Sequence, residues 1–200
     1  MPKFSETEKD QIRKSLLNKG RELFIQYGLA KTSIDDIVHA CGIAKGSFYR
    51  FFSSKEELFY VILKQEEEVR ANVLMQLFRE DLPPKQLIRA FFHKSLELVE
   101  ENPFFRFLFQ DGEYERVIRK LPKALHEEWQ SQDVEHGVEA VNRLIKRGVL
   151  PNGDPQLIVG IMKAVMLLRL HKDKFGETLF PLVMEKIIDY VSEGLTKEHE

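Results

Sequence analysis

The segment KGSFYR, residues 45–50, holds the side chains best suited to recognising a charged partner that accepts hydrogen bonds. In a helix, Lys45 and Tyr49 lie on the same side because they are four residues apart. Ammonium, guanidinium and hydroxyl groups donate to phosphate oxygens and base edges, and Gly46 permits a close approach. The donors are Lys45, Ser47, Tyr49 and Arg50. Together they indicate contact with nucleic acid, although each alone is equally typical of a solvated surface.

Three phenylalanines on the opposite side of this segment predict the core that holds it. Phe48, Phe51 and Phe52 are spaced i, i+3 and i+4, so a helix over residues 45–52 presents all three rings to one side. We expect the rings to pack against apolar residues of the preceding helices. These partners are Leu23, Phe24 and Ile37.

Capping patterns and glycines place three further helices around this segment. Ser5 opens a capping box, Thr32 repeats the pattern with Asp35, and Gly28 and Gly42 supply the stops. The predicted helices cover residues 5–28, 32–40, 45–52 and 54–77. Two short helices joined by a turn, the second with a polar exposed face, form a helix-turn-helix whose second helix enters the major groove.

The rest of the sequence predicts more helices and no strands, so the fold class is all-α. The segment DLPP, residues 81–84, marks a boundary because two adjacent prolines cannot continue a helix. Helical stretches are expected over residues 85–101, 103–110, 122–147, 155–173 and 178–195. A long fourth helix therefore joins the N-terminal three-helix head to a C-terminal helical domain.

Residues 12–60 resemble the TetR family of transcriptional regulators. The resemblance rests on ELFIQYG, TSIDDIVHACGIAKGSFYRFF and SSKEELF, in that order. It implies a helix-turn-helix DNA-binding domain over residues 1–55 and a helical ligand-binding and dimerisation domain over residues 56–200. The DNA-binding residues that it implies are Thr32, Ser33, Lys45, Gly46, Ser47, Tyr49, Arg50 and Lys55, with Arg50 the best candidate for reading a guanine.

Three residues depart from the family pattern. Ala44 stands where serine is usual, which removes an N-cap at a cost of about 1 kcal/mol if nothing replaces it. Phe51 replaces a common tyrosine and lacks its hydroxyl, and Val38 replaces a usual alanine between the two short helices. These departures affect details of the interface and leave the helix-turn-helix prediction intact.

One short recognition helix reads few base pairs, so we expect a homodimer on a palindromic operator in double-stranded DNA. The last two long helices carry apolar stripes that suit the dimer interface. The expected interface residues are Leu157, Ile161, Val165, Leu168, Leu182, Ile187, Tyr190 and Val191. The alternative is that both stripes fill the core of one subunit.

The resemblance also implies a cavity for a small apolar inducer in the C-terminal domain. Inducer binding would shift the fourth helix and release the operator, which makes the chain a repressor. The candidate ligand-binding residues are Phe92, His93, Phe104, Phe109, Trp129, Met162 and Met166. Rings at helical spacing are more often plain core, and the compound is not identified by these residues.

Composition limits the other classes of function. The net charge is −2, but residues 1–55 carry 10 Lys or Arg against 6 Asp or Glu, a basic head on an acidic body. With 43% hydrophobic residues the chain is expected to fold, and a single cysteine allows no intramolecular disulfide. We find no signal-peptide pattern and no membrane span, so a cytoplasmic protein is expected.

No catalytic motif, metal-ligand spacing or phosphate-binding glycine loop is found, so neither an enzyme nor a bound metal or cofactor is expected. His126 and His136 fit no common metal site. The remaining alternative is a helical carrier or adaptor that binds an apolar ligand without DNA. Such a protein would have no use for the basic head.

Overall fold

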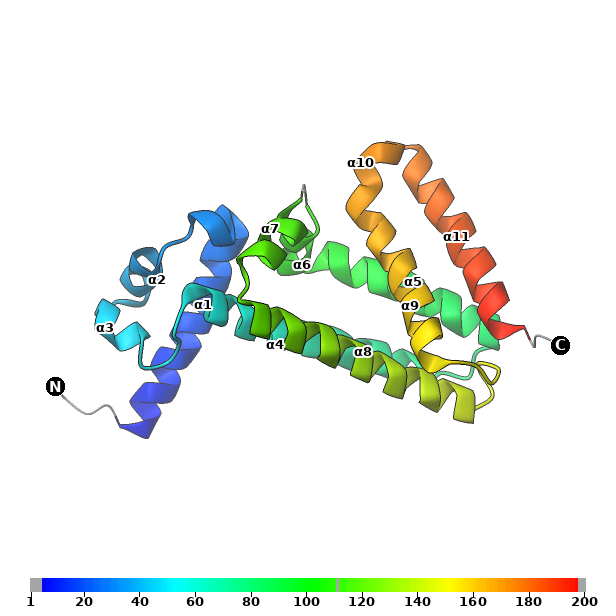
Figure 1. Ribbon diagram of the computed structural model, residues 1–200, viewed down its shortest axis with the longest axis horizontal. Helices are drawn as coiled ribbons and strands as arrows, with labels where there is room; N and C mark the ends of the chain where they lie inside the picture. Colours follow the sequence, from blue (N-terminus) through cyan, green and yellow to red (C-terminus); the bar gives the residue numbers. More distant parts are fainter. Residues whose placement is uncertain (1–4, 111, 198–200) are drawn as a thin grey trace. The chain divides into compact units, whose positions relative to one another are not determined.

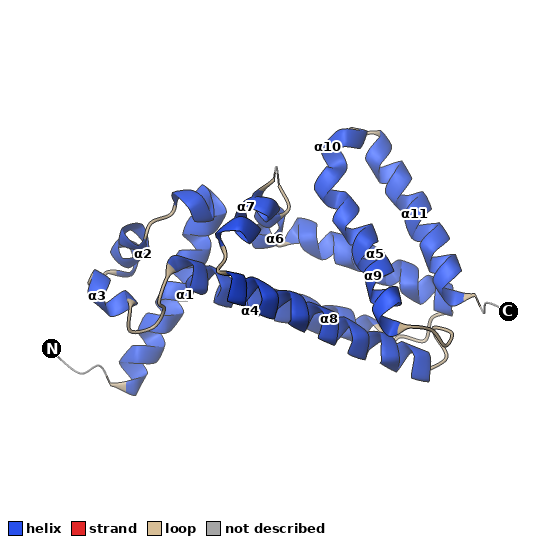
Figure 2. Ribbon diagram, in the orientation of Figure 1, coloured by secondary structure: helices blue, strands red, loops and turns tan. Residues whose placement is uncertain are grey.

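The computed structural model describes residues 5–110 and 112–197. Over these residues it contains helices and loops and no strand (Figures 1 and 2), which confirms the all-α prediction. None of the described helices is long and apolar enough to cross a membrane. The elements are α1 (Glu6–Lys31), α2 (Ile34–Cys41), α3 (Lys45–Phe48), α4 (Lys55–Leu77), α5 (Pro84–Glu101), α6 (Pro103–Leu108), α7 (Glu113–Lys120), α8 (Lys123–Lys146), α9 (Pro155–Leu167), the 3-10 helix η1 (Leu168–His171), α10 (Lys172–Phe175) and α11 (Leu179–Thr196).

The chain forms two compact units. Within the described residues, unit 1 takes its members from residues 1–68 and 103–126, and unit 2 from residues 69–102 and 127–200. Helices α4 and α8 contribute residues to both units. The division into functional domains at residue 55 stays a prediction, because compactness does not assign activity.

Capping boxes start α1 and α2. The Glu8 carboxylate accepts from Ser5 N at 2.7 Å, and Glu8 N donates to the Ser5 hydroxyl at 3.3 Å, as expected. At α2 the box is formed by Ser33 and Asp36, one residue later than the sequence pattern predicts. The reason is that the Thr32 hydroxyl is engaged elsewhere. Each box satisfies backbone N–H groups that a helix leaves unpaired at its start.

Two glycines with positive φ end these helices, as predicted. Gly28 (φ 79°, ψ 160°) interrupts the regular path of α1, and one further turn follows before Thr32. Gly42 (φ 67°, ψ 31°) ends α2 in the left-handed conformation. Only glycine adopts these values at little cost, so both positions set where the next segment starts.

Helix α3 is shorter than predicted. It ends at Phe48, and turns continue the coil to Phe52, with Phe51 N and Phe52 N donating to Phe48 O at 2.9 and 3.1 Å. Ala44 provides no side-chain cap, as its departure from the family pattern implies. A helix without a capped first turn and with Gly46 inside it has little intrinsic stability. Its position therefore depends on packing.

Aromatic rings form much of the core of unit 1. Phe48 and Phe52 are buried as predicted, but Phe51 is half-buried, because the chain leaves α3 before this ring reaches the core. Phe59 of α4 contacts Phe24 of α1 and Phe104 of α6, both at 5.3 Å between ring centroids. These contacts join α1, α4 and α6.

Helix α7 was not predicted from the sequence. Its segment EYERVIRK has one fully buried residue, Val117, and is otherwise charged or half-buried. Tyr114, Val117 and Ile118 have helical spacing, but a segment of eight residues is too short for periodicity alone to predict a helix. The helix packs against α1 and α6 within unit 1.

Unit 2 is built on a continuous apolar cluster from α5, α8, α9 and α11. Phe92, Val141, Met162 and Ile188 represent the four helices in it. The helix expected over residues 155–173 is broken after Leu167, because α9 ends there and η1 begins at Leu168. Only the first part of this segment carries the apolar stripe that packs in the cluster.

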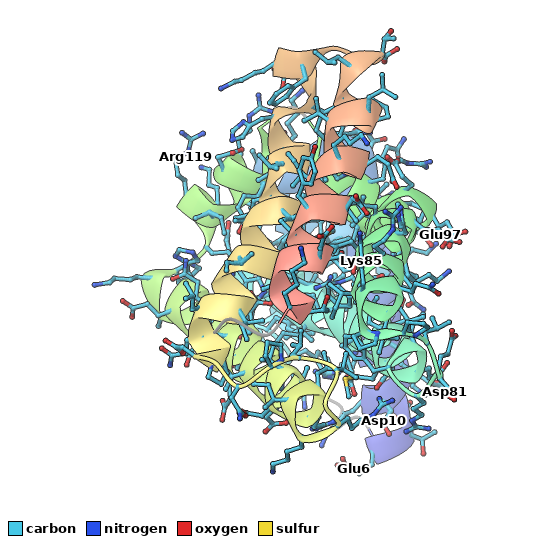
Figure 3. All side chains as sticks on the ribbon, turned by 90° about the vertical axis from the view of Figure 1, so that its right-hand side faces the viewer. Glu6, Asp10, Asp81, Lys85, Glu97 and Arg119 are labelled. Carbon is cyan, nitrogen blue, oxygen red and sulfur yellow. The ribbon has the colours of Figure 1, made fainter. Side chains whose placement is uncertain are left out.

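Ion pairs fasten α5 to α11 on the surface of unit 2. Lys85, which is labelled in Figure 3, lies 3.1 Å from Asp189 and 3.2 Å from Glu193. Arg89 pairs with Asp189 at 2.6 Å and with Glu185. These contacts form a ladder of alternating charge, which we call the α5–α11 ladder.

Candidate DNA interface

The predicted recognition surface is presented by α3 and the turn after it. Tyr49 is 53% exposed, and Lys45, Gly46 and Arg50 are also exposed. Tyr49 contacts the edge of the fully buried Phe48 ring, with 5.6 Å between centroids. A buried ring thus anchors a polar outer face, as the spacing of the segment predicts.

An ion pair joins α3 to α2. Lys45 Nζ donates to the Asp35 carboxylate at 2.8 Å. This hydrogen bond raises the pKa of Lys45, so the ammonium stays charged at neutral pH. The sequence analysis missed Asp35, because the pair is ten residues apart across a turn and has no helical spacing. The contact fixes the direction of a side chain predicted to bind phosphate.

Ser33 is engaged in the cap of α2. Its hydroxyl donates to the Asp36 carboxylate at 2.6 Å and accepts from Asp36 N at 3.1 Å. The hydrogen bonds from the Ser33 hydroxyl and backbone lower the pKa of Asp36. The charged cap orders the first turn of α2, whose N–H groups are the donors that helix starts offer to anions.

Thr32 and Lys55 face the protein. Thr32 is 1% exposed, and its hydroxyl donates to Gly28 O at 2.9 Å. Lys55 Nζ donates to Leu29 O and Thr32 O, both at 2.7 Å. The structure brings the two predicted phosphate contacts together, but both polar side-chain groups are satisfied by the end of α1.

A groove of about 470 Å³ runs across this surface. The α1–α2 turn, α3 and the start of α4 line it. The predicted DNA-binding residues in its lining are Thr32, Ser33, Lys45, Tyr49 and Lys55. A smaller cavity of about 260 Å³ lies between α7 and the last turn of α1. Thr32 and Lys55, which are 23 positions apart in the sequence, thus meet on one surface of unit 1.

The predicted ligand-binding residues are distributed over both units. Phe104 and Phe109 belong to unit 1, and the others to unit 2. Phe92 and Met162 are part of the apolar cluster of unit 2, and Met166 packs against it. Trp129 is buried, and Phe109 is half-buried. Their shared role as a cavity lining stays a prediction.

His93 does not lie where a cavity-lining residue is expected. Its side chain is 47% exposed, with Nε2 3.3 Å from Glu185 beside the α5–α11 ladder. The cause is its position on α5, next to the buried Phe92 but turned toward α11. We therefore correct its assignment to a surface residue.

The predicted dimer stripes combine two faces of each helix. Leu157, Leu182 and Tyr190 are 62%, 64% and 67% exposed, whereas Val165 is 4% exposed and belongs to the core of its own unit. Ile161, Leu168, Ile187 and Val191 are half-buried. Leu179, 53% exposed, was missed because it precedes the predicted stripe. The exposed members of the predicted stripes are large apolar side chains on the surface of unit 2.

Residues 16–61 match the family model described as bacterial regulatory proteins, tetR family. Over these residues the chain is similar to the TetR family. The HTH-type transcriptional regulator RutR of Escherichia coli is 29% identical over 97 residues, which cover 48% of this chain and 45% of RutR. The match thus spans about half of that relative. The HTH-type transcriptional repressor KstR2 of Mycobacterium tuberculosis is 24% identical over 188 residues, 93% of this chain and 94% of KstR2.

Solved structures share the fold of this chain. A TetR-family regulator from Pectobacterium atrosepticum has a TM-score of 0.70 at 18% identity and covers 98% of this chain and 100% of its own. A Clostridium perfringens protein named for the regulation of fatty acid metabolism has a TM-score of 0.62 at 18% identity, with 92% and 100% covered. These relatives are named as regulators and none as an enzyme, in agreement with the sequence analysis.

Proposed function

We propose that the protein is a cytoplasmic, homodimeric transcriptional repressor that binds a palindromic operator and releases it when a small apolar molecule binds. The observation that carries the proposal is the α2–turn–α3 arrangement in a region similar to the TetR family, with a polar outer face held on buried phenylalanines. In this motif the second helix reads the major groove and the first lies across the backbone.

The proposed DNA contacts fall into two kinds. Tyr49 and Arg50 contact base edges, with Arg50 donating to a guanine, while Lys45 and Ser47 bind phosphate. Gly46 has open space around its Cα, which allows the backbone of α3 to approach the duplex. Ser33 and the N–H groups at the start of α2 hold a further phosphate.

Dimerisation through α9 and α11 would place two recognition helices on successive major grooves. The exposed Leu157, Leu182 and Tyr190 support this proposal, because a monomer in water gains nothing from leaving three large apolar side chains on two adjacent helices uncovered. Two-fold symmetry of the protein then matches a palindromic operator.

The proposed ligand is apolar because the C-terminal core is rich in aromatic and Met side chains. Two similar proteins support this class by name, the Clostridium perfringens regulator of fatty acid metabolism and the ketosteroid regulator KstR2, whose structure has a TM-score of 0.54 at 23% identity. Since α4 contributes residues to both units, a ligand that shifts it would change the spacing of the recognition helices.

Selection of bound fragments from genomic DNA at about 0.15 M salt, followed by sequencing, tests the proposed function. We expect one palindromic motif to be enriched, and no enrichment with Tyr49→Ala, whose exposed side chain can be removed without loss of fold. A folded protein that enriches no motif would favour the alternative, a helical carrier or adaptor that binds an apolar ligand without DNA.

A further inference from the structure

We propose that Lys55 serves DNA binding as a positioning residue, which clamps the end of α1 to the start of α2 and does not itself bind a phosphate. The proposal rests on the proposed function, because it assigns a role within the same DNA interface. It revises the phosphate contact that the family resemblance implies for this lysine.

The Lys55 ammonium is directed at carbonyl oxygens of its own chain. Nζ lies 2.7 Å from Leu29 O, 2.7 Å from Thr32 O and 3.5 Å from Ala30 O. An ammonium has three N–H donors and no acceptor, so three converging carbonyls use its full capacity. A phosphate oxygen could bind only in exchange for one of them.

These carbonyls require a donor from another element. The positive φ of Gly28 interrupts the hydrogen-bond ladder of α1 just before Leu29, and the last carbonyls of a helix lack partners within the helix. Thr32 donates to earlier carbonyls, from its N and its hydroxyl to Gly28 O at 3.2 and 2.9 Å and from its hydroxyl to Leu23 O at 3.3 Å, whereas Lys55 donates to Leu29 O. A cation at this end also complements the negative pole of the helix dipole.

The energetics of α4 alone do not explain a lysine at this position. Lys55 is the first residue of α4, where the helix dipole disfavours a positive charge. Glu56 and Glu57, the next two residues, carry the sign that this end prefers. The lysine is therefore explained by contacts with another element, and its hydrogen bonds are made to carbonyl oxygens at the end of α1.

The clamp acts on the DNA surface through the residues that follow α1. The Thr32 carbonyl is held by Lys55, and the buried Thr32 side chain cannot turn outward. Ser33, the next residue, caps α2 and lines the same groove as Lys45. Lys55 thus fixes where the first turn of α2 starts, and with it the donors offered to the DNA backbone.

The salt dependence of operator binding separates positioning from phosphate contact. The binding constant falls with salt, and each neutralised phosphate steepens this fall by about 0.9 in the magnitude of the slope of log K against log salt. A contact made by both subunits steepens it by about 1.8. We expect Lys55→Met to weaken binding about tenfold with an unchanged slope and to lower Tm by about 5 °C. Lys45 is an exposed cation of the recognition surface, and we expect the matched variant Lys45→Met to reduce the magnitude of the slope by about 1.8.

Arginine provides the second comparison. It binds phosphate well, but its planar guanidinium does not match three carbonyls that converge on one point. We expect Lys55→Arg to resemble Lys55→Met in Tm and in affinity. A slope whose magnitude is smaller by about 1.8 in Lys55→Met, or full affinity in Lys55→Arg, would overturn the proposal.

The thermal measurement keeps this proposal distinct from the proposed function, because it needs no DNA. An unchanged Tm of Lys55→Met overturns the clamp, whereas a wild type that binds no operator refutes only the proposed function. Lys146→Met, an exposed lysine of α8, controls for the loss of one charge. If Lys55→Met does not fold, Lys55→Gln keeps N–H donors at this position without the charge, and we expect weaker binding with an unchanged slope.

Discussion

At the residue scale, the side chains of the proposed DNA interface are held by contacts that limit their freedom. Lys45 is tied to Asp35, and Tyr49 packs on the edge of Phe48. Holding these groups in place lowers the entropy lost when they bind a duplex. The sequence predicts that Lys45 and Tyr49 share a face, since this follows from helical spacing. It does not predict Asp35 as a partner or the burial of Thr32, because both depend on how a turn closes.

Arg50→Ala is expected to cost about 1–3 kcal/mol of operator binding and to relax discrimination at one base pair of each half-site. The reason is that an arginine pairs with both acceptors on the major-groove edge of guanine. Fluorescence anisotropy with the wild-type operator and with the guanine replaced measures both effects. Arg147→Ala, an exposed arginine after α8, serves as the control. A loss that is equal on all sequences would assign Arg50 to phosphate.

At the element scale, capping residues and glycines decide where the helices of unit 1 begin and end. Capping boxes and positive-φ glycines are local, so the sequence predicts α1 and α2 to within a few residues. The short α3, the unexpected α7 and the break of α9 at Leu167 are not predictable in this way. Each depends on which side chains find room in a core formed by distant segments.

Gly28→Ala is expected to destabilise the protein by about 2 kcal/mol, because φ 79° with ψ 160° is strained for any residue with a Cβ. A Cβ at this position would also lie 3.4 Å from the Glu113 carboxylate. Chemical denaturation measures the loss.

Gly46→Ala is the matched control for this substitution. Its Cβ meets nothing within 4 Å, so we expect stability to be kept while operator affinity falls. Equal stability of Gly28→Ala and wild type would show that the turn after α1 is not constrained by this glycine.

The α5–α11 ladder makes the stability of unit 2 depend on pH. Hydrogen bonds from Lys85 and Arg89 lower the pKa of Asp189, which is also flanked by Glu185 and Glu193 on α11. A carboxylate whose pKa is lower in the folded state stabilises the fold above its ordinary pKa, and this contribution is lost as the pH falls through the folded value. The ladder therefore stabilises the protein at neutral pH and weakens in acid.

Asp189→Asn is expected to lower Tm at pH 7, with a difference from wild type that shrinks below about pH 4. Thermal unfolding of both proteins from neutral to acidic pH measures the difference. Asp173→Asn, in α10 and outside the ladder, is the control. A difference that does not change with pH would mean that the substitution acts through packing and not through charge.

At the scale of the whole molecule, the proposed function requires two copies of the chain. The sequence predicts the two helices of the proposed interface, but it assigns Val165 to the outer stripe because periodicity alone does not tell which apolar face meets its own core. Periodicity also fails to tell which of the predicted ligand-binding residues lie in plain core. Their aromatic and Met character is read from the sequence, whereas the side chain that lines a cavity is decided by packing.

Leu182→Glu is expected to convert a dimer into a monomer, because it places a charge at the centre of an apolar surface. The monomer should keep its helix content, since Leu182 is 64% exposed, and should lose most of its operator affinity. Sedimentation velocity measures the mass. Val69→Glu, at an equally exposed valine of α4, should remain a dimer.

The most direct measurement of the central claim is a guanine-methylation protection footprint on the operator that the selection identifies. A dimer with α3 in the major groove predicts two protected patches related by two-fold symmetry, with centres about 10 base pairs apart or a multiple of that spacing. Tyr49→Ala should abolish both patches together. Protection of a single patch, or a footprint that survives removal of Tyr49, would contradict recognition by a pair of α3 helices.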